Sequence, residues 1–194
     1  TMRRIPVQQR PDLAKTARVH GYDYRDGMPY WDETAYYRFS LRQIEDGIEK
    51  PAMEIDAMCF QLLDRSVADE TIYRRLGIPA AYWDYIAASW KIREKDLYGR
   101  MDLSYDGTGD AKLLEYNADT PTTLYDSAVF QWVWLEEASA AGLIPEACDQ
   151  FAELHDDLVQ AFAAMDNGGI VHFACLIDVE DDKDTVDYLE ECAQ

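Results

Sequence analysis

The spacing of apolar residues changes at about residue 97, and this change constrains the fold more than any other feature. Before it, apolar residues recur at helical spacing. Residues 97–103 and 112–117 instead alternate between apolar and polar side chains, which is typical of β-strands with one buried face. Between these segments, Asp106-Gly107-Thr108-Gly109 has the residue types of a tight turn. The sequence therefore predicts a β-hairpin after a largely helical segment.

The segments before the hairpin are predicted to be helices. We expect one helix over residues 31–50, with Asp32 as its N-cap, and a second that begins at Pro51. The sequence Gly77-Ile78-Pro79 breaks the chain before a short aromatic helix over residues 82–90.

After the hairpin, helices are expected over residues 123–135, about 145–165 and 184–193. Residues 170–177 form a continuous apolar run of strand length. Such a run is typical of a strand buried on both faces of a parallel sheet. The predicted fold class is α/β: one domain over residues 1–194, with a helical N-terminal portion and a mixed sheet.

The net charge of the chain limits the classes of molecule that it is expected to bind. There are 18 Lys and Arg residues against 38 Asp and Glu residues, a formal net charge of −20. Such a chain repels phosphate backbones and anionic lipids, so nucleic acids and membranes are poor partners. Metal ions and polyamines are better candidates. The alternative is that the carboxylates only keep the surface soluble.

The cysteines and the N-terminal residues indicate a cytoplasmic protein. The 4 cysteines have no C-x-x-C spacing, and the 3 histidines lack the spacing of zinc ligands. We therefore expect free thiols in a reducing compartment. The first residues have no apolar signal segment, and no run of residues is long enough to span a membrane.

Polar residues gather on one face of the predicted hairpin. If the strands pair through a loop at residues 107–110, one face is apolar and the other carries charged and amide side chains. The expected cross-strand pairs are Asp102 with Glu115, Arg100 with Asn117, Met101 with Tyr116, and Leu103 with Leu114.

Two carboxylates that lie directly opposite on a sheet are about 5 Å apart and repel each other. A bound cation, the neighbouring Arg100 or a raised carboxyl pKa would offset this repulsion. Carboxylates and an amide oxygen suit Mg²⁺, with phosphate completing its shell. The other interpretation is a solvated strand face with one Arg–Asp ion pair. The residues alone leave both open, and the common nucleotide-loop, zinc-protease and serine-hydrolase motifs are absent from the sequence.

The hairpin residues also resemble a known family. Arg100-Met101-Asp102, followed by Leu114-Glu115-Tyr116-Asn117-Ala118-Asp119-Thr120-Pro121-Thr122, is similar to the signature of glutathionylspermidine synthases, which are ATP-grasp carboxylate–amine ligases. The resemblance to the single-domain bacterial branch covers essentially the whole chain. It includes Arg10-Pro11-Asp12, Pro29-Tyr30-Trp31, Tyr98-Gly99-Arg100, Gln131-Trp132-Val133-Trp134 and Thr185-Val186-Asp187-Tyr188-Leu189.

This resemblance implies a reaction and its substrates. In the family, ATP phosphorylates the carboxylate of a glutathione-like acid, and a polyamine such as spermidine attacks the acyl phosphate to form an amide. Thr120 and Thr122 stand where the family has hydroxyl residues at the thiol-peptide site.

The resemblance also implies roles for the hairpin residues. Asp102, Glu115 and Asn117 would hold the Mg²⁺ ions that bridge the ATP phosphates, and Arg100 would stabilise the acyl phosphate or the substrate carboxylate. The role of magnesium agrees with the repulsion argument, because a metal ion offsets both carboxylates.

Family chains are much longer, and their nucleotide-binding ATP-grasp lobe would follow where this sequence ends. We therefore expect these 194 residues to be the N-terminal part of a longer ligase, and we expect that this part by itself does not turn over ATP. The competing hypothesis is a non-catalytic acidic module that binds a polyamine or a partner protein. The two differ in whether replacing Asp102 or removing Mg²⁺ has any effect.

Overall fold

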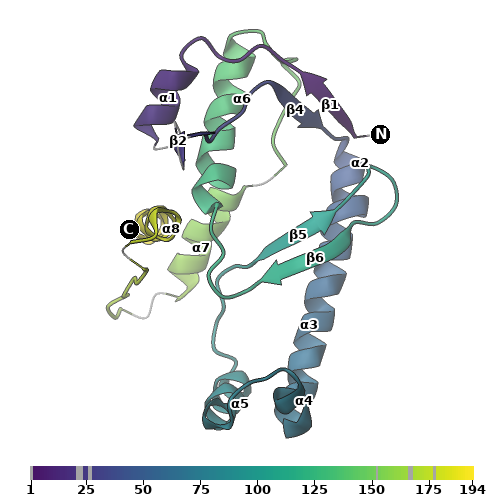
Figure 1. Cartoon of the computed structure of the whole chain (residues 1–194), viewed down its shortest axis with the longest axis vertical. Helices are drawn as coiled ribbons and strands as arrows, with labels where there is room; N and C mark the ends of the chain where they lie inside the picture. Colours follow the sequence, from purple (N-terminus) through teal and green to yellow (C-terminus); the bar gives the residue numbers. More distant parts are fainter. Residues whose placement is uncertain (1, 21–23, 26–27, 152, 166–167, 177) are drawn as a thin grey trace. The chain divides into compact units, whose positions relative to one another are not determined.

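The structure is a computed structural model that describes residues 2–20, 24–25, 28–151, 153–165, 168–176 and 178–194. The described chain combines helices with small antiparallel sheets, which is consistent with the predicted α/β class (Figure 1). The chain divides into two compact units, which we call the terminal unit (residues 1–43 and 119–194) and the hairpin unit (residues 44–118). That they act as one domain stays a prediction.

In the described residues, the strands form three antiparallel two-stranded sheets, β1 with β4, β2 with β3, and β5 with β6. The elements of the terminal unit are β1 (Arg3–Pro6), α1 (Leu13–Val19), β2 (Tyr24–Arg25), β3 (Met28–Pro29), β4 (Ala35–Arg38), η3 (Asp126–Phe130), α6 (Gln131–Ala140), α7 (Leu154–Met165) and α8 (Glu180–Cys192).

One part of the core of the terminal unit contains a buried ion pair beside a buried aromatic side chain. The Phe130 side chain is fully buried, and the Trp31 ring packs edge-on against it at 4.6 Å between centroids. Beside it, the Arg10 guanidinium donates through Nε to Glu33 at 3.0 Å and through Nη1 to Glu137 at 2.7 Å. Because these donors and acceptors satisfy one another, the charges are tolerated away from water.

The first predicted helix is wrong over residues 31–40, where β4 pairs with β1. Asp32 accepts hydrogen bonds from the backbone N–H and hydroxyl of Thr34, at 2.8 and 3.1 Å, so it stabilises a turn. The helix begins at Leu41 instead. There, Ser40 and Gln43 form a reciprocal capping box, with bonds of 3.0 and 3.3 Å.

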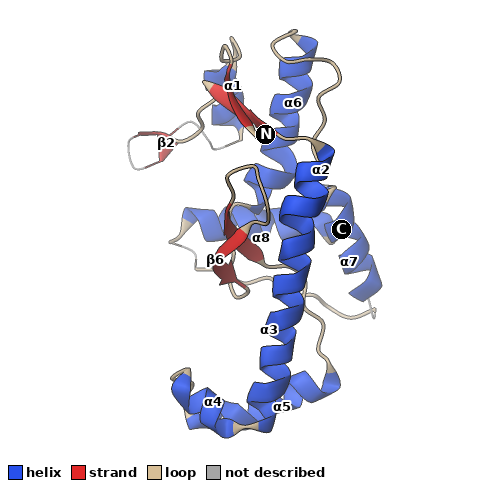
Figure 2. Ribbon diagram, turned by 90° about the vertical axis from the view of Figure 1, so that its right-hand side faces the viewer, coloured by secondary structure: helices blue, strands red, loops and turns tan. Residues whose placement is uncertain are grey.

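A long helical run, which begins with α2 (Leu41–Ile44), leads into the hairpin unit and stands beside the hairpin (Figure 2). The elements of the hairpin unit are η1 (Glu45–Glu49), α3 (Lys50–Ala68), α4 (Glu70–Arg75), η2 (Ala80–Tyr82), α5 (Trp83–Ile92), β5 (Arg100–Ser104) and β6 (Lys112–Asn117).

Pro51 lies in the first turn of α3, as predicted, and α3 continues the helical run of α2 and η1 without a break. Proline has no N–H to donate and clashes with the carbonyl four residues earlier, here that of Gly47. The turns around Gly47 are accordingly of π type, over Glu45–Glu49. The Gly47 carbonyl accepts instead from the backbone N–H of Ala111, at 2.7 Å, and so fixes the end of the hairpin loop to the helix.

The predicted break and aromatic helix are confirmed. The chain turns at Gly77, where φ is +73°, after α4 has ended at Arg75. On α5, the Trp83 ring stacks at 5.7 Å on Tyr73, which is 3% exposed. The buried ring at the centre of these contacts is Tyr73, whereas Tyr82 and Tyr85 are 58% and 71% exposed, so only part of the aromatic cluster belongs to the core.

Two predictions for the C-terminal residues need correction. The helix expected from about Pro145 begins only at Leu154. Residues 170–176 form no strand, and Ile177 lies outside the described residues. Ile170 and Val171 are 84% and 61% exposed rather than buried, because no described strand pairs with this segment. The last helix is confirmed as α8, and it begins at Glu180.

Candidate active-site hairpin

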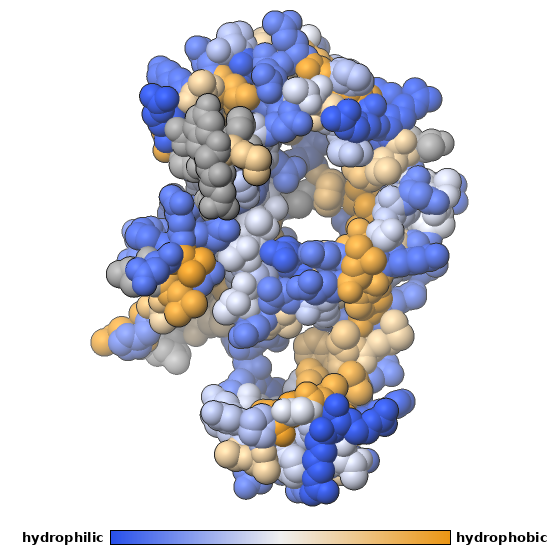
Figure 3. Space-filling model, viewed as in Figure 1, coloured by the Kyte–Doolittle hydropathy of each residue, from blue (hydrophilic) through white to orange (hydrophobic). Residues whose placement is uncertain are grey.

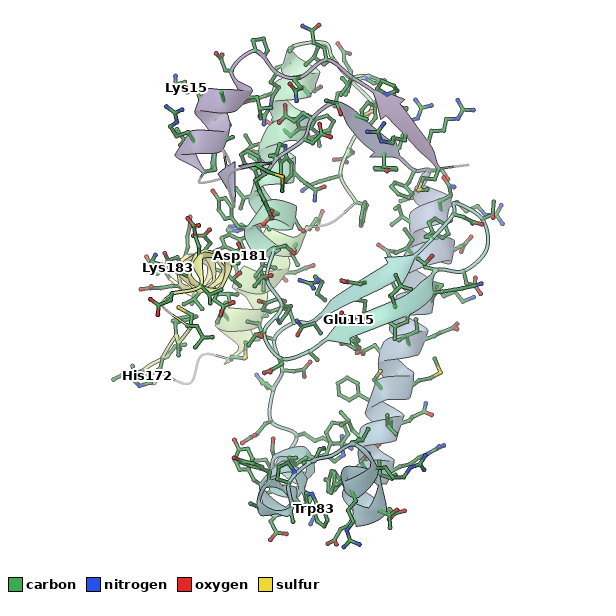
Figure 4. The ribbon with its side chains drawn as sticks, viewed as in Figure 1. Lys15, Trp83, Glu115, His172, Asp181 and Lys183 are labelled. Atoms are coloured by element: carbon green, nitrogen blue, oxygen red, sulfur yellow. The ribbon has the colours of Figure 1, made fainter. Side chains whose placement is uncertain are left out.

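The β5–β6 hairpin brings together four of the six predicted site residues. Asp102 pairs with Glu115 and Arg100 pairs with Asn117, in the register expected from sequence. Residues two apart on a strand, and residues directly opposite, share a face of the sheet. Therefore these four side chains lie on one face of the hairpin; Glu115 is labelled on β6 in Figure 4.

The predicted pairing fails beyond Asp102. Leu103 pairs with Leu113 rather than Leu114, because the register shifts between Asp102 and Leu103. Such a bulge adds one residue to one strand and reverses the faces that follow. Leu113 consequently lines an open apolar groove against α3, while Leu114 is 71% exposed.

This apolar groove lies between α3 and β6, on the side of the hairpin unit where hydrophobic residues gather in Figure 3. It has a volume of about 480 Å³ and is lined by Ile55, Met58, Cys59, Leu62, Ala111, Lys112 and Leu113.

One ion pair joins two of the site residues. Arg100 Nε donates to Asp102 Oδ1 at 3.0 Å, and the two side chains are 34% and 45% exposed. The Arg–Asp pair of the second interpretation is therefore present. It occupies one oxygen of the Asp102 carboxylate, and the directly opposite Glu115 keeps the local charge negative. This partly solvated position leaves the carboxylates accessible to a cation.

Tyr116, on the other face of β6, holds the strand to α3. Its hydroxyl donates to Asp56 Oδ1 at 2.8 Å. Burial, followed by the hydrogen bond and the charge of Asp56, raises the pKa of Tyr116 from 10.0 to about 12. The hydrogen bond from Tyr116 therefore holds β6 to α3 at the position between Glu115 and Asn117.

Gly99 makes room for this arrangement. A Cβ atom at Gly99 would lie 2.6 Å from Cε2 of Tyr116 and 3.2 Å from the carbonyl oxygen of Asn117. Only glycine allows the start of β5 to approach β6 so closely. Tyr116, Asp56 and Gly99 were not predicted from the sequence as positioning residues. The Tyr-Gly-Arg sequence at 98–100 was the available signal for Gly99.

The remaining two predicted residues, Thr120 and Thr122, belong to the terminal unit. Thr120 is exposed and Thr122 is half-buried, in the segment between β6 and the helix that contains η3. The next residue, Thr123, has φ of +67°, a left-handed conformation that is strained for a β-branched residue. Their role in substrate binding stays a prediction.

The donor set of the hairpin fits magnesium. No group of three or more His, Cys, Asp or Glu side chains is close enough to hold a metal ion in the described parts of the chain. The hairpin offers instead two carboxylates, Asp102 and Glu115, with the amide of Asn117 on the same face. Mg²⁺ prefers such oxygen ligands in small number, because substrate phosphates and water complete its shell.

Comparison with known proteins places this hairpin in a family. Residues 4–194 match the family described as Glutathionylspermidine synthase preATP-grasp. The chain belongs to the glutathionylspermidine synthase family. It is 35% identical, over 95% of its length, to a Haemophilus influenzae protein named as an acid–amine ligase. It is also 31% identical, over 61% of its length, to a trypanothione synthetase from Crithidia fasciculata.

The chain spans only part of both relatives, 47% of the acid–amine ligase and 17% of the trypanothione synthetase. Membership of the glutathionylspermidine synthase family confirms the resemblance drawn from the hairpin residues.

Two other predictions concern the cysteines and membrane-spanning helices. All four cysteines are free thiols, as predicted. In the described residues, no helix is long and apolar enough to cross a membrane.

Proposed function

We propose that the chain supplies the metal and acyl-phosphate site of an ATP- and magnesium-dependent acid–amine ligase. The observation that carries the proposal is the face shared by Arg100, Asp102, Glu115 and Asn117, in register, within a chain of the glutathionylspermidine synthase family. Carboxylates, an amide and a guanidinium on one face suit the handling of phosphoryl groups.

The proposed reaction has two steps. The substrate carboxylate takes the γ-phosphoryl group of ATP, so that an acyl phosphate forms and ADP leaves. The amine nitrogen then attacks the acyl carbon, inorganic phosphate leaves, and the amine loses a proton as the amide forms. Bound magnesium would neutralise the phosphoryl charge that develops in the first step.

The residues of the hairpin divide this work. Asp102, Glu115 and Asn117 would hold the metal through their oxygens. Arg100 already lies 3.0 Å from Asp102, so its guanidinium can bind a phosphate or carboxylate next to the metal ligands. Tyr116 fixes the strand that carries two of the three ligands. ATP is a co-substrate, and its adenine-binding residues would lie outside these 194 residues.

For substrates, we propose a thiol peptide similar to glutathione and a polyamine. The name of the trypanothione synthetase relative supports this class, as does the net charge of −20, which favours a polycationic amine. Thr120 and Thr122 would contact the peptide. A cytoplasmic location agrees with the four free cysteines.

The test measures ADP release by the gene product, expressed from its natural start to its natural stop, with Mg-ATP, glutathione and spermidine, each omitted in turn. The proposal expects release that requires both the acid and the amine. Release without either, or none from a folded protein, contradicts it.

A binding experiment distinguishes the alternative, a non-catalytic polyamine or protein-binding module. That function predicts spermidine binding that changes neither on removal of Mg²⁺ nor in Asp102→Ala. The ligase predicts that Asp102→Ala, Glu115→Ala and Asn117→Ala each abolish ADP release while folding survives. Asn117→Ala is the most informative of the three, because it leaves the formal charge unchanged.

A further inference from the structure

Residues 170–176 have a sequence that favours a strand, but none of the described strands pairs with them. The run is Ile-Val-His-Phe-Ala-Cys-Leu, and its β-branched and aromatic residues favour extended backbone. Ile170, Val171 and Leu176 are nevertheless 84%, 61% and 68% exposed. No described strand lies beside them. Three large apolar side chains exposed within seven residues mark an interaction surface.

The segment is fixed on one side. The Phe173 ring lies 6.0 Å from that of Phe162 on α7. By contrast, His172 points away from α7 and α8 (Figure 4). The segment therefore rests on α7 by one face and presents the other face and its backbone edge to a partner.

α8 follows at the right distance to make a crossover. Seven residues of strand span about 23 Å at ~3.3 Å each. The 13 residues of α8 return the chain by about 20 Å at ~1.5 Å each. A strand followed by such a helix is the first part of a β-α-β unit, whose second strand lies parallel to the first.

α8 is already held in place for this arrangement. Its Tyr188 hydroxyl lies 2.8 Å from Nδ1 of His155 on α7, and Cys192 Sγ lies 3.8 Å from the same nitrogen. Tyr188 and Cys192 are each 3% exposed. The helix of the crossover is thus packed, and only the pairing of the strand is lacking.

We propose that residues 170–176 become a buried strand by pairing in parallel with an apolar strand of the same protein that lies outside residues 1–194. The acid–amine ligase relative supports this occupant, because the chain spans 47% of its length. The description of the matched family region as preATP-grasp also supports further polypeptide beside it. The inference does not depend on the proposed reaction.

Cys175 reports on this pairing, because it is an exposed thiol inside the segment. The rate of its alkylation by N-ethylmaleimide, followed by mass spectrometry, is compared between the 194-residue chain and the gene product expressed from its natural start to its natural stop. Each rate is normalised to that in urea. We expect rapid labelling in the chain and labelling at least ~100-fold slower in the gene product. The buried Cys192 is the reference, slow in both.

Equal labelling of Cys175 in the two proteins would overturn the proposal. So would labelling of the 194-residue chain that slows as its concentration rises, because the partner would then be a second copy.

A second pair of variants keeps the test independent of thiol chemistry. Val171→Lys should lower the melting temperature of the gene product but not of the chain, whereas Val19→Lys, at a position 73% exposed on α1, should lower neither. Equal effects of Val171→Lys on both proteins would contradict the pairing.

Discussion

Replacing Tyr116 with phenylalanine tests how the candidate site is held in place. The change removes the hydroxyl that donates to Asp56 Oδ1 at 2.8 Å but keeps the ring that packs beside Gly99. A hydrogen bond to a carboxylate contributes about 2 kcal/mol to stability. We expect Tyr116→Phe to lower the free energy of unfolding by that amount near neutral pH.

Burial of Tyr116, together with this hydrogen bond, gives the protein a defined sensitivity to alkali. The pKa of Tyr116 is raised from 10.0 to about 12 in the folded protein. A group whose pKa is raised by folding stabilises fully below its unfolded pKa, and this contribution is lost as pH rises through the folded pKa. The window is therefore about pH 10 to 12. Two pH units at ~1.4 kcal/mol each set an upper limit of roughly 3 kcal/mol on this loss, and solvent screening around the partly buried hydroxyl makes the loss smaller.

The assay is urea unfolding of the wild type and of Tyr116→Phe at about pH 8 and about pH 11. The other tyrosines titrate in both proteins, so the difference between the two isolates Tyr116. We expect the wild type to be more stable than Tyr116→Phe at the lower pH, and we expect this difference in stability to shrink at the higher pH. The control is Tyr82→Phe, at a position 58% exposed. For this variant we expect the same free energy of unfolding as the wild type at both pH values. An advantage that stays constant between the two pH values would refute the reasoning.

Three further predictions concern other parts of the molecule. Glu33→Gln should destabilise the chain by about 3 kcal/mol in urea unfolding, because it leaves Arg10, 3% exposed in its side chain, without its main counter-charge. Asp187→Asn, which breaks an exposed ion pair with Lys183, should cost far less stability than Glu33→Gln, and equal costs would contradict the argument. Gly99→Ala should cost about 1–3 kcal/mol by displacing Tyr116, and amide NMR shifts limited to residue 99 would count against this. Finally, the 194-residue chain should release no ADP from ATP, and measurable release would show that it contains a complete nucleotide site.

The register of the hairpin could be predicted because local rules determine it. Alternation and turn residues place Arg100 opposite Asn117 and Asp102 opposite Glu115, as the structure has them. The bulge after Asp102 could not be predicted, because it depends on how the loop is anchored. The backbone N–H of Ala111 bonds to the carbonyl of Gly47, a residue distant in sequence.

The helix starts show the same limit. Asp32 is an N-cap residue type, but its carboxylate stabilises a turn around Thr34. Ser40 and Gln43 form the actual capping box, which a Ser-x-x-Gln pattern would have indicated. The continuous apolar run predicted a strand at residues 170–177, but a strand also needs a partner, and none of the described strands pairs with residues 170–176.

The most direct test of the central claim is the magnesium dependence of ADP release by the gene product carrying Asn117→Ala. The control is Leu114→Ala, which changes an exposed residue of the same strand. If Asp102, Glu115 and Asn117 hold the metal, Asn117→Ala lowers the rate at least ~100-fold and raises the magnesium needed for half-maximal release, while Leu114→Ala behaves as the wild type. Release by Asn117→Ala with an unchanged rate and an unchanged magnesium requirement would contradict a metal site on this face of the hairpin.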